Sequence, residues 1–365
     1  MIGASLRRSD LHYSSGMAVH TSSSGAVSSL DELYLILDDG TVQGLGEVRL
    51  NIQYLTGHSP EAIICAASEF LRTVIFPKDD EGLMALTQNL PTTLPSSVRM
   101  LVDIAIHDLV ARRKNISVCA LTGSGTGTSY KTNQTLFFSD IETFRKRCET
   151  YVQRGFTALK IRIGNDPEED IAKFRWVRDR FHDDVDLAAD ANGAWSLDQA
   201  SHTLDRLAAF NLEYIEQPLP AACWGQLPEL TRNSPVPVML DESLSSFEDC
   251  LKLAESGLPL MAHLKLVKLG GLSALAKAAA VLSDAGVDLM IGQMNEGGAA
   301  TAAALQASIA LRPRFAELYG ADGLRDDPAI GLNYDQGEIL IADTHMAGLG
   351  ISFDISRTSP LTGRA

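Results

Sequence analysis

Five short apolar runs in the middle of the chain each carry an ionisable side chain at or near their end. They occupy residues 158–163, 185–190, 212–216, 236–241 and 262–267. The ionisable residues are, in chain order, Lys160, Asp190, Glu216, Asp241 and Lys265, separated by 30, 26, 25 and 24 residues. One strand plus the crossover helix of a parallel sheet takes roughly 25 to 30 residues. The charges therefore occupy equivalent places in successive βα units.

The same spacing continues on both sides of these runs. A β-rich run at 132–138 precedes them, and runs at 287–293 and 315–319 follow them, with helical spacing of apolar residues in between. Seven or eight such units predict an α/β barrel rather than an open sheet. The C-terminal ends of barrel strands converge on one face, where barrel enzymes keep their active sites. We therefore expect one site built from five strands.

The sequence before this repeat predicts a second unit. Residues 33–47 read as a β-hairpin, and residues 59–113 have the apolar spacing of helices. Irregular stretches at 20–26 and 49–57 read as loops. The segment therefore predicts an α+β unit that carries two long loops.

These patterns predict three parts of the chain. We expect an α+β unit over 1–125, a barrel with the site over 126–325, and a C-terminal tail over 326–365. The tail contains β-rich stretches at 338–341 and 348–353, which we expect to return to the first unit.

Charge and composition narrow the classes of function. The 365 residues include 46 acidic and 31 basic ones, a net charge of −15, which argues against a nucleic-acid or anionic-membrane surface. The five cysteines are scattered without a CxxC pair, which favours reduced thiols in a cytoplasmic protein. The first residues lack the apolar stretch of a secretory signal, and no apolar run is long enough to predict a membrane span.

The three acids at the strand ends predict a metal site. Carboxylates packed together raise each other's pKa and do not all stay ionised in a buried site without a cation. Ligation by oxygen atoms alone suits Mg²⁺, with Mn²⁺ as the near alternative. No His or Cys stands at these three positions, so zinc is disfavoured. The alternative is that Asp190, Glu216 or Asp241 caps a helix or pairs with a lysine of the barrel.

The two lysines predict proton transfer. Lys160 and Lys265 come from strands on opposite sides of the acids. A partly desolvated lysine that faces a cation has a lowered pKa and can act as a base near neutral pH. A metal that holds a carboxylate stabilises the charge formed when the α-proton leaves. Together these groups suit abstraction of a proton next to a carboxylate.

On these motifs the chain resembles the enolase superfamily, and within it the mandelate racemase/muconate-lactonizing enzyme family. The resemblance covers nearly the whole chain and rests on five motifs in barrel order: Lys160-x-Arg162, Asp190-Ala-Asn-Gly-Ala-Trp195, Ile215-Glu-Gln-Pro218, Leu240-Asp-Glu-Ser243 and Lys265-Leu-Val-Lys-Leu-Gly-Gly271. It implies a modified TIM (β/α)7–8 barrel with an N-terminal α+β capping domain completed by the C-terminal tail. It also implies Asp190, Glu216 and Asp241 as Mg²⁺ ligands, and loops near 16–26 and 49–57 that close over the substrate.

The resemblance is to the muconate-lactonizing and dipeptide-epimerase branch, because Lys265 ends strand six and strand seven lacks a histidine. That branch uses one lysine on each face, with Lys-x-Lys in the second strand, whereas this chain has Lys160-x-Arg162. Guanidinium is a poor base but a good carboxylate clamp. We therefore expect Lys265 to be the main acid/base, Lys160 to stabilise the enediolate, and Arg162 to position charge.

Other residues are weaker candidates. Candidate substrate contacts are Asn192, Glu296, His20 and Tyr54. Glu242 and Asn192 are candidates to hydrogen-bond to the metal ligands. Lys268 lies three residues after Lys265, and strand alternation predicts a structural role on the opposite side.

The sequence therefore predicts a Mg²⁺-dependent enzyme that removes the proton α to a carboxylate and forms a metal-stabilised enediolate. The outcome is isomerisation (racemase, epimerase or cycloisomerase) or β-elimination (dehydratase). The alternative is a non-catalytic metal-binding relative that acts as a ligand-binding or scaffold protein. The expected partners are a small-molecule carboxylate substrate and further copies of the chain in a homo-oligomer, with no nucleic acid and no membrane.

Overall fold

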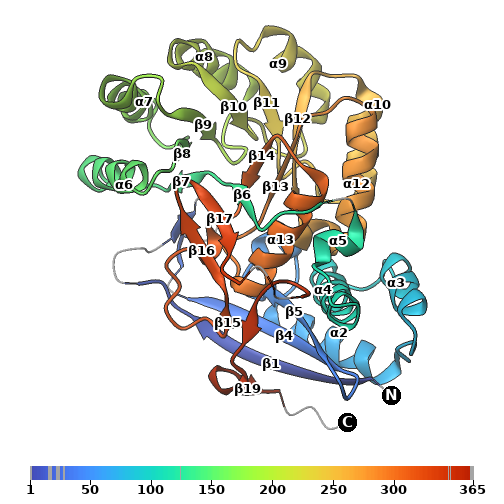
Figure 1. Ribbon diagram of the computed structural model, residues 1–365. Coiled ribbons are helices and arrows are strands. Elements are labelled where there is room, and N and C mark those ends of the chain that lie inside the picture. The colour runs from blue at the N-terminus through green and yellow to red at the C-terminus, as the bar shows by residue number, and fades with distance from the viewer. Residues whose placement is uncertain are drawn as a thin grey trace.

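The computed structural model describes residues 2–14, 19–21, 25–27, 29–123, 125–343, 345 and 347–361. Eight strands form one sheet in sequence order, and every described pairing within it is parallel (Figure 1). The backbone N–H of Asn133, just before the first strand, donates to the carbonyl of Ala316 in the last at 3.1 Å. The sheet is therefore a nearly closed barrel, which confirms the predicted fold class. Its strands are β7 Gln134–Leu136, β8 Ala158–Arg162, β9 Asp186–Asp190, β10 Leu212–Glu216, β11 Val238–Leu240, β12 Leu260–Lys265, β13 Leu289–Gly292 and β14 Phe315–Glu317.

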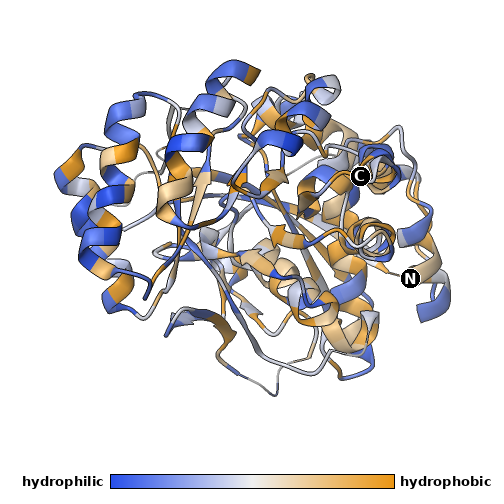
Figure 2. Cartoon of the chain, turned by 90° about the horizontal axis from the view of Figure 1, so that it is seen from above, coloured by the Kyte–Doolittle hydropathy of each residue, from blue (hydrophilic) through white to orange (hydrophobic). Residues whose placement is uncertain are grey.

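Helices connect the strands and surround the barrel, and hydrophilic and hydrophobic residues alternate along them (Figure 2). In α8 the buried residues are Ala200, Thr203, Leu204 and Leu207, spaced three or four apart as a helix face requires. Ser196 and Gln199 form a capping box that begins this helix. The helices are α6 Ile141–Gln153, α7 Pro167–Phe181, α8 Leu197–Leu207, α9 Leu227–Asn233, α10 Phe247–Ser256, α11 Leu266–Leu269, α12 Leu272–Asp284 and α13 Gly298–Leu311, with short 3₁₀ turns at Ala208–Phe210, Trp224–Gln226, Tyr319–Ala321 and Ile355–Arg357.

The side chains inside the barrel form two layers. The layer nearer the N-terminal ends of the strands is largely apolar, and the layer at their C-terminal ends is largely polar. Five buried residues with partly buried Phe315 fill the apolar layer: Ala188, Tyr214, Met239, Met261 and Met290. Side chains of a strand return to the same face every two residues. The residues two positions further along therefore form the next layer, at the mouth of the barrel. They are Asp190, Glu216, Asp241, His263, Gly292 and Glu317.

The N-terminal unit is an antiparallel sheet with helices beside it. Its strands are β1 Gly3–Leu11, β4 Leu30–Asp38 and β5 Gln43–Arg49, and the tail adds β19 Ser359–Pro360 alongside β1. The predicted hairpin is confirmed, and Asp39 closes its turn by accepting the N–H groups of Thr41 and Val42. The remaining elements are β2 Val19–Thr21, β3 Gly25–Val27, α1 Gln53–Thr56, α2 Pro60–Thr73, α3 Asp80–Gln88, α4 Ser96–Arg113 and α5 Val118–Thr122.

The tail returns to the N-terminal unit at 348–353, as predicted: the backbone N–H of Leu349 donates to Asp108, and Arg112 donates to the carbonyl of Ile351. The predicted strand at 338–341 is present as β17 Glu338–Ile341, but it pairs with β16 Leu332–Asp335 and β6 Ser129–Lys131. Within the stretch 348–353, β18 Ser352–Phe353 pairs with β15 Ala329–Ile330. Of the tail strands in the described chain, β19 alone joins the N-terminal sheet, because pairing partners are set by long-range packing that strand propensity does not encode.

Helix α4 packs closely against strand β5. A Cβ atom added at Gly46 would lie 2.0 Å from the carbonyl oxygen of Leu101, and one at Gly44 would lie 2.3 Å from that of Ala105. The two glycines therefore allow backbone contact between the sheet and its central helix. No helix in the described part of the chain is long and apolar enough to cross a membrane.

We predict that Gly46→Ala destabilises the protein by about 1–3 kcal/mol, because the added methyl group forces β5 and α4 apart. Gly225→Ala is the matched control, since a Cβ there meets nothing within 4 Å. Denaturant unfolding of both variants checks this. If Gly46→Ala had the same free energy of unfolding as Gly225→Ala, close contact between β5 and α4 would not be needed for stability.

Candidate active site

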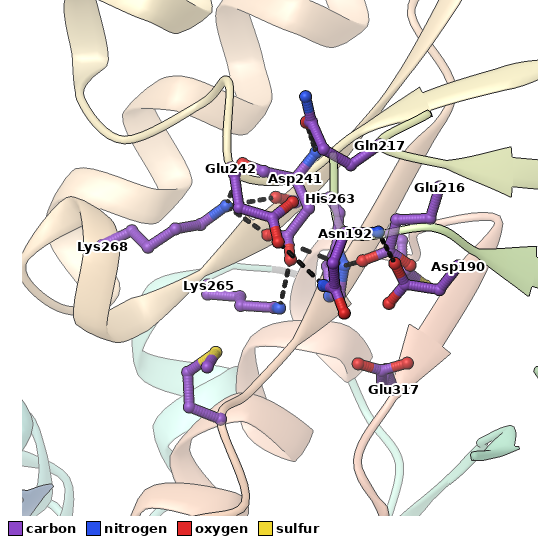
Figure 3. A network of polar contacts seen from close by, with 12 residues as sticks. Asp190, Asn192, Glu216, Gln217, Asp241, Glu242, His263, Lys265, Lys268 and Glu317 are labelled. Atoms are coloured by element: carbon purple, nitrogen blue, oxygen red, sulfur yellow. Dashed lines mark hydrogen bonds and ion pairs between the residues drawn. The ribbon is translucent and has the colours of Figure 1, made fainter. Parts of the chain in front are cut away.

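Acidic and basic side chains meet at the C-terminal ends of the barrel strands. Figure 3 shows the carboxylates of Asp190, Glu216 and Asp241 beside one shared space, with Lys265 and Glu317 at its edge. The three carboxylates come from the ends of β9, β10 and β11, and all are at most 5% exposed. The structure therefore brings together the acids that the spacing of the sequence predicted.

Lys160 is the central cation of this cluster. Its Nζ donates to Glu216 Oε2 at 2.8 Å, lies 3.6 Å from Asp190 Oδ2, and pairs closely with Glu317. Burial alone lowers the pKa of Lys160, but the charges of these acids outweigh burial and raise the pKa well above its ordinary value. Lys160 is therefore a fixed positive charge rather than a base.

Asp241 is held by two lysines. Lys265 Nζ donates to its Oδ2 at 2.7 Å, and Lys268 Nζ donates to its Oδ1 at 2.6 Å (Figure 3). The prediction that Lys268 lies on the opposite side was wrong. Strand β12 ends at Lys265, and the helical turn α11 brings Lys268 back to the site.

The loops after β9 and β10 are held in a backbone conformation that side chains rarely adopt. Asn192 and Gln217 have φ values of 45° and 38°, in the left-handed region. Gln217 Oε1 accepts the backbone N–H groups of Asp241 and Ser243. Asn192 donates its amide to Glu242 Oε1 at 2.8 Å. These bonds fix the positions of the two strand ends that carry Asp190 and Asp241.

The electrostatics of the acids fit a divalent cation. Burial, and then the charge of Asp190, raises the pKa of Glu216 well above its ordinary value. Nearby lysines lower the pKa of Asp241 despite burial. Ligand atoms of Glu216, Asp241 and His263 lie within 4.8 Å of one another. Glu216 and Asp241 offer carboxylate oxygens to this group, as Mg²⁺ prefers, and His263 offers a nitrogen. The group does not include Asp190, which is paired with Arg162. A bound cation would relieve the repulsion that raises the pKa of Glu216.

Arg162 pairs with Asp190 through Nη1 and Oδ2 at 2.9 Å. This ion pair does not have the geometry of a hydrogen bond. Both Nε–H and Nη1–H of Arg162 are buried and have no hydrogen-bond acceptor among the described residues. Burial lowers the pKa of Arg162, but the charge of Asp190 outweighs it and raises the pKa above its ordinary value. Arg162 is thus a permanent cation with N–H groups left for another acceptor.

The pKa of Lys265 lies above its ordinary value, whereas the sequence predicted a lowered one. Burial lowers it, but the charges of Asp241, Glu216 and Glu317 outweigh burial and raise it. The predicted lowering assumed a cation beside the amine, and Asp241 is its nearest partner here. A cation bound to Asp241 reverses the local balance of charge.

A cavity of about 200 Å³ lies above these groups, between the barrel and the N-terminal unit. Arg162, Asp190, Asp241 and Lys265 line it, as do the predicted contacts Asn192 and Tyr54. Glu296, a predicted substrate contact, is not among the residues that line the cavity. It is 1% exposed, and its Oε2 accepts the backbone N–H of Met294. The side chain of His20, and much of the loop predicted at 16–26, lie outside the described residues.

Four residues near the site were missed or left without a role by sequence reasoning. They are His263, which contacts Glu216, Glu317 at the end of the eighth strand, Gln217, and Arg49, which lines the cavity from β5. His263 and Glu317 do carry a signal: both face the barrel by strand alternation, two residues before Lys265 and at the end of a predicted strand. Arg49 begins the stretch 49–57 that the resemblance placed over the substrate, but no local pattern singled out its side chain.

Comparison of the sequence and the structure with known proteins identifies the class of protein. A family model described as Enolase C-terminal domain-like matches residues 143–357. The L-Ala-D/L-Glu epimerase of Clostridium acetobutylicum is 30% identical over 336 residues, covering 89% of this chain and 92% of the relative. The chloromuconate cycloisomerase of a Pseudomonas species is 31% identical over 325 residues, or 84% of each chain. A dipeptide epimerase structure from Enterococcus faecalis, complexed with Mg and the dipeptide L-Leu-L-Tyr, matches with a TM-score of 0.86 at 24% identity, covering 96% of this chain and 98% of that one.

The chain therefore belongs to the enolase superfamily, as an enzyme of the mandelate racemase/muconate-lactonizing enzyme family. Its named relatives here are isomerases, either epimerases or cycloisomerases. The predicted family is confirmed.

Glu296 gives a prediction for the pH dependence of stability. Burial raises its pKa from 4.5 to about 7. Between these values the folded state binds a proton that the unfolded chain has lost, so stability falls as pH rises from about 4.5 to 7. Glu296→Gln removes this effect and is expected to stabilise the protein at pH 8 by up to roughly 3 kcal/mol.

Unfolding of Glu296→Gln and the wild type at pH 5 and pH 8 measures this difference. The two proteins are expected to differ less at pH 5 than at pH 8. A variant that is less stable than the wild type at pH 8 would show that an ionised Glu296 stabilises the fold.

Proposed function

We propose that this enzyme removes the proton α to a carboxylate of a small-molecule substrate, with Lys265 as the base and Asp190, Glu216 and Asp241 as ligands of Mg²⁺. The observation that carries the proposal is that Asp190, Asp241 and Lys265 line one cavity, while Glu216 is fully buried at the end of the strand between Asp190 and Asp241. The cation supplies positive charge that stabilises the enediolate formed when the proton leaves. Mn²⁺ is the alternative cation, because it accepts the same oxygen ligands.

The geometry supports one base rather than two. Lys265 faces the cavity from β12, whereas β8 presents Lys160 tied to Glu216 and Glu317, and Arg162 tied to Asp190. Lys160 also pairs with Glu317, which is not a proposed ligand, so it keeps an acidic partner when a cation binds. The guanidinium of Arg162 stays protonated at neutral pH. Lys265 differs because its direct acidic partner is Asp241, a proposed ligand of the cation. Proton removal therefore takes place on the face of the substrate that Lys265 approaches.

The cations on β8 have binding roles in this proposal. Lys160 adds positive charge next to the acids and compensates charge that develops on the substrate carboxylate. Arg162 offers its unaccepted N–H groups to an oxygen of the substrate. Asn192, which lines the same cavity, fixes Glu242 and limits the space beside the ligands.

We propose isomerisation as the outcome, because the relatives named above are isomerases. Their similarity does not choose between epimerisation and cycloisomerisation, since both kinds occur at about 30% identity. The single base favours a reaction that needs proton transfer on one face only. β-Elimination also needs one base, and product analysis separates it from isomerisation by the loss of a leaving group.

Two expectations from the sequence stay predictions. They are that copies of the chain form a homo-oligomer, and that the enzyme works in the cytoplasm. The parts proposed for the domains, 1–125, 126–325 and 326–365, also stay a prediction as folding units.

We predict that Lys265→Ala abolishes α-proton exchange while metal binding persists. The assay incubates the enzyme with Mg²⁺ in D₂O and a panel of dipeptides, N-acyl amino acids, hydroxy acids and unsaturated diacids, and measures deuterium at the α-carbon. The variant is expected to lose at least 10²-fold in exchange rate, the range for removal of a general base. Calorimetry with Mn²⁺ reports binding. Unchanged exchange would remove Lys265 from the reaction, and no exchange by the wild type with any acid would favour a non-catalytic binding protein.

A second prediction concerns Arg162. The wild type is expected to exchange the α-proton of only one stereoisomer of a chiral substrate, because one base faces one side. Arg162→Lys places an amine on the opposite side and is expected to add slow exchange of the other stereoisomer. Arg162→Gln is the matched control that adds none. Exchange of both stereoisomers at similar rates by the wild type would contradict the single-base proposal.

A further inference from the structure

His263 is a fully buried histidine in the polar layer of the barrel. It lies on β12 two residues before Lys265, is 0% exposed, and is not among the residues that line the cavity. Its Nδ1 lies 2.9 Å from Glu216 Oε1 and 4.0 Å from Asp241 Oδ1 (Figure 3). Its ring therefore reaches the proposed metal ligands from below rather than from the substrate side.

The other edge of the ring rests against Gly292 on β13. A Cβ atom at Gly292 would lie 2.0 Å from His263 Nε2. Gly292 lies within a strand and is not among the glycines with positive φ, so its backbone does not require glycine. The missing side chain at 292 instead makes the space that the imidazole fills. Nε2 has no hydrogen-bond partner among the described residues.

We propose that His263 is a positioning residue for the cation site, which holds Glu216 by a hydrogen bond from Nδ1–H and depends on Gly292 for its place. The inference rests on the proposed function, because it takes Glu216 as a metal ligand. It adds the buried imidazole of His263, which packs between β12 and Gly292 of β13, to the groups that set the affinity of the site for the cation.

The direction of this hydrogen bond follows from the chemistry of a ligand. Glu216 is ionised when it binds a cation, and an ionised carboxylate only accepts hydrogen bonds. Nδ1 must then carry the proton, and Nε2, next to Gly292, is the unprotonated nitrogen. A proton on Nε2 would be a buried donor without an acceptor among the described residues.

Two donors fix the Glu216 carboxylate from opposite sides. Lys160 on β8 donates to Oε2 at 2.8 Å, and His263 on β12 contacts Oε1 at 2.9 Å. Glu216 is 0% exposed, so water cannot replace a lost donor without a change of structure. Groups that hydrogen-bond to metal ligands fix their orientation, and loss of such a group typically weakens metal binding or activity by about 10–100-fold.

The first test measures Mn²⁺ binding by calorimetry to the full-length protein with His263→Leu and His263→Asn. Leucine fills the space without a donor, and asparagine can place its amide nitrogen where Nδ1 lies. We expect His263→Leu to weaken Mn²⁺ binding by about 10–100-fold, and His263→Asn to stay close to the wild type. Thermal unfolding without metal checks that each variant is folded.

The second test uses Gly292. Gly292→Ala is expected to weaken Mn²⁺ binding as His263→Leu does, because its methyl group displaces the imidazole. Adding His263→Asn to Gly292→Ala is expected to restore binding, because asparagine has no atom at the Nε2 position. A merely structural defect at 292 would persist in the double variant.

The outcomes separate this inference from the proposed function. Wild-type Mn²⁺ affinity in folded His263→Leu would overturn the positioning role while the proposed function stands. A nitrogen bonded directly to Mn²⁺, detected by pulsed electron paramagnetic resonance of the wild type, would also overturn it, since His263 would then be a ligand. Failure of the wild type to bind Mn²⁺ would contradict the proposed function itself.

Discussion

Buried negative charge at the mouth of the barrel is the constraint on which the rest of this structure depends. Four carboxylates, Asp190, Glu216, Asp241 and Glu317, lie in one layer with little or no exposure. Four cations pair with them: Lys160, Arg162, Lys265 and Lys268. The basic side chains match these acids in number, and Asp241 pairs with two lysines. In the proposed function, a cation bound to Asp241 would leave Lys265 free to turn to the cavity.

This balance explains why two lysines of similar appearance have different roles. Lys160 contacts acids on three strands and is 1% exposed, so its charge is fixed whatever occupies the cavity. Lys265 has one direct acidic partner and lines the cavity. Lys268 remains bound to the backbone carbonyls of Asp241 and His263 as well as to the Asp241 carboxylate. Only Lys265 combines access to substrate with a partner that a cation can replace.

The sequence predicted the barrel and the acids for the same physical reason. Strand ends in a parallel barrel converge, so a charge that repeats every 24 to 30 residues must gather on one face. The role of Lys268 could not be predicted, because it depends on where β12 ends and α11 begins. His263 could have been found by alternation with Lys265, but its importance depends on the glycine of the next strand. The pairing of the tail strands and the reach of Arg49 depend on long-range packing, which local patterns do not encode.

The N-terminal sheet completes the cavity through polar contacts rather than through an apolar interface alone. Arg49, at the end of β5, donates to the carbonyls of Met294 and Asn295 beyond β13. Glu47, on the same face of the strand, accepts the N–H of Ala300 at the start of α13. These bonds join strand β5, which covers the cavity, to the part of the barrel after β13, the strand next to that of Lys265. The shape of the space above the base is therefore set by both parts of the chain.

The most direct test of this account is anomalous diffraction from crystals of the protein grown with Mn²⁺. The account predicts a single strong peak at the C-terminal ends of β9, β10 and β11, bonded to oxygens of Asp190, Glu216 and Asp241, with Lys265 Nζ turned toward the cavity. A peak bonded elsewhere, or a site at which Asp190 makes no bond, would contradict it.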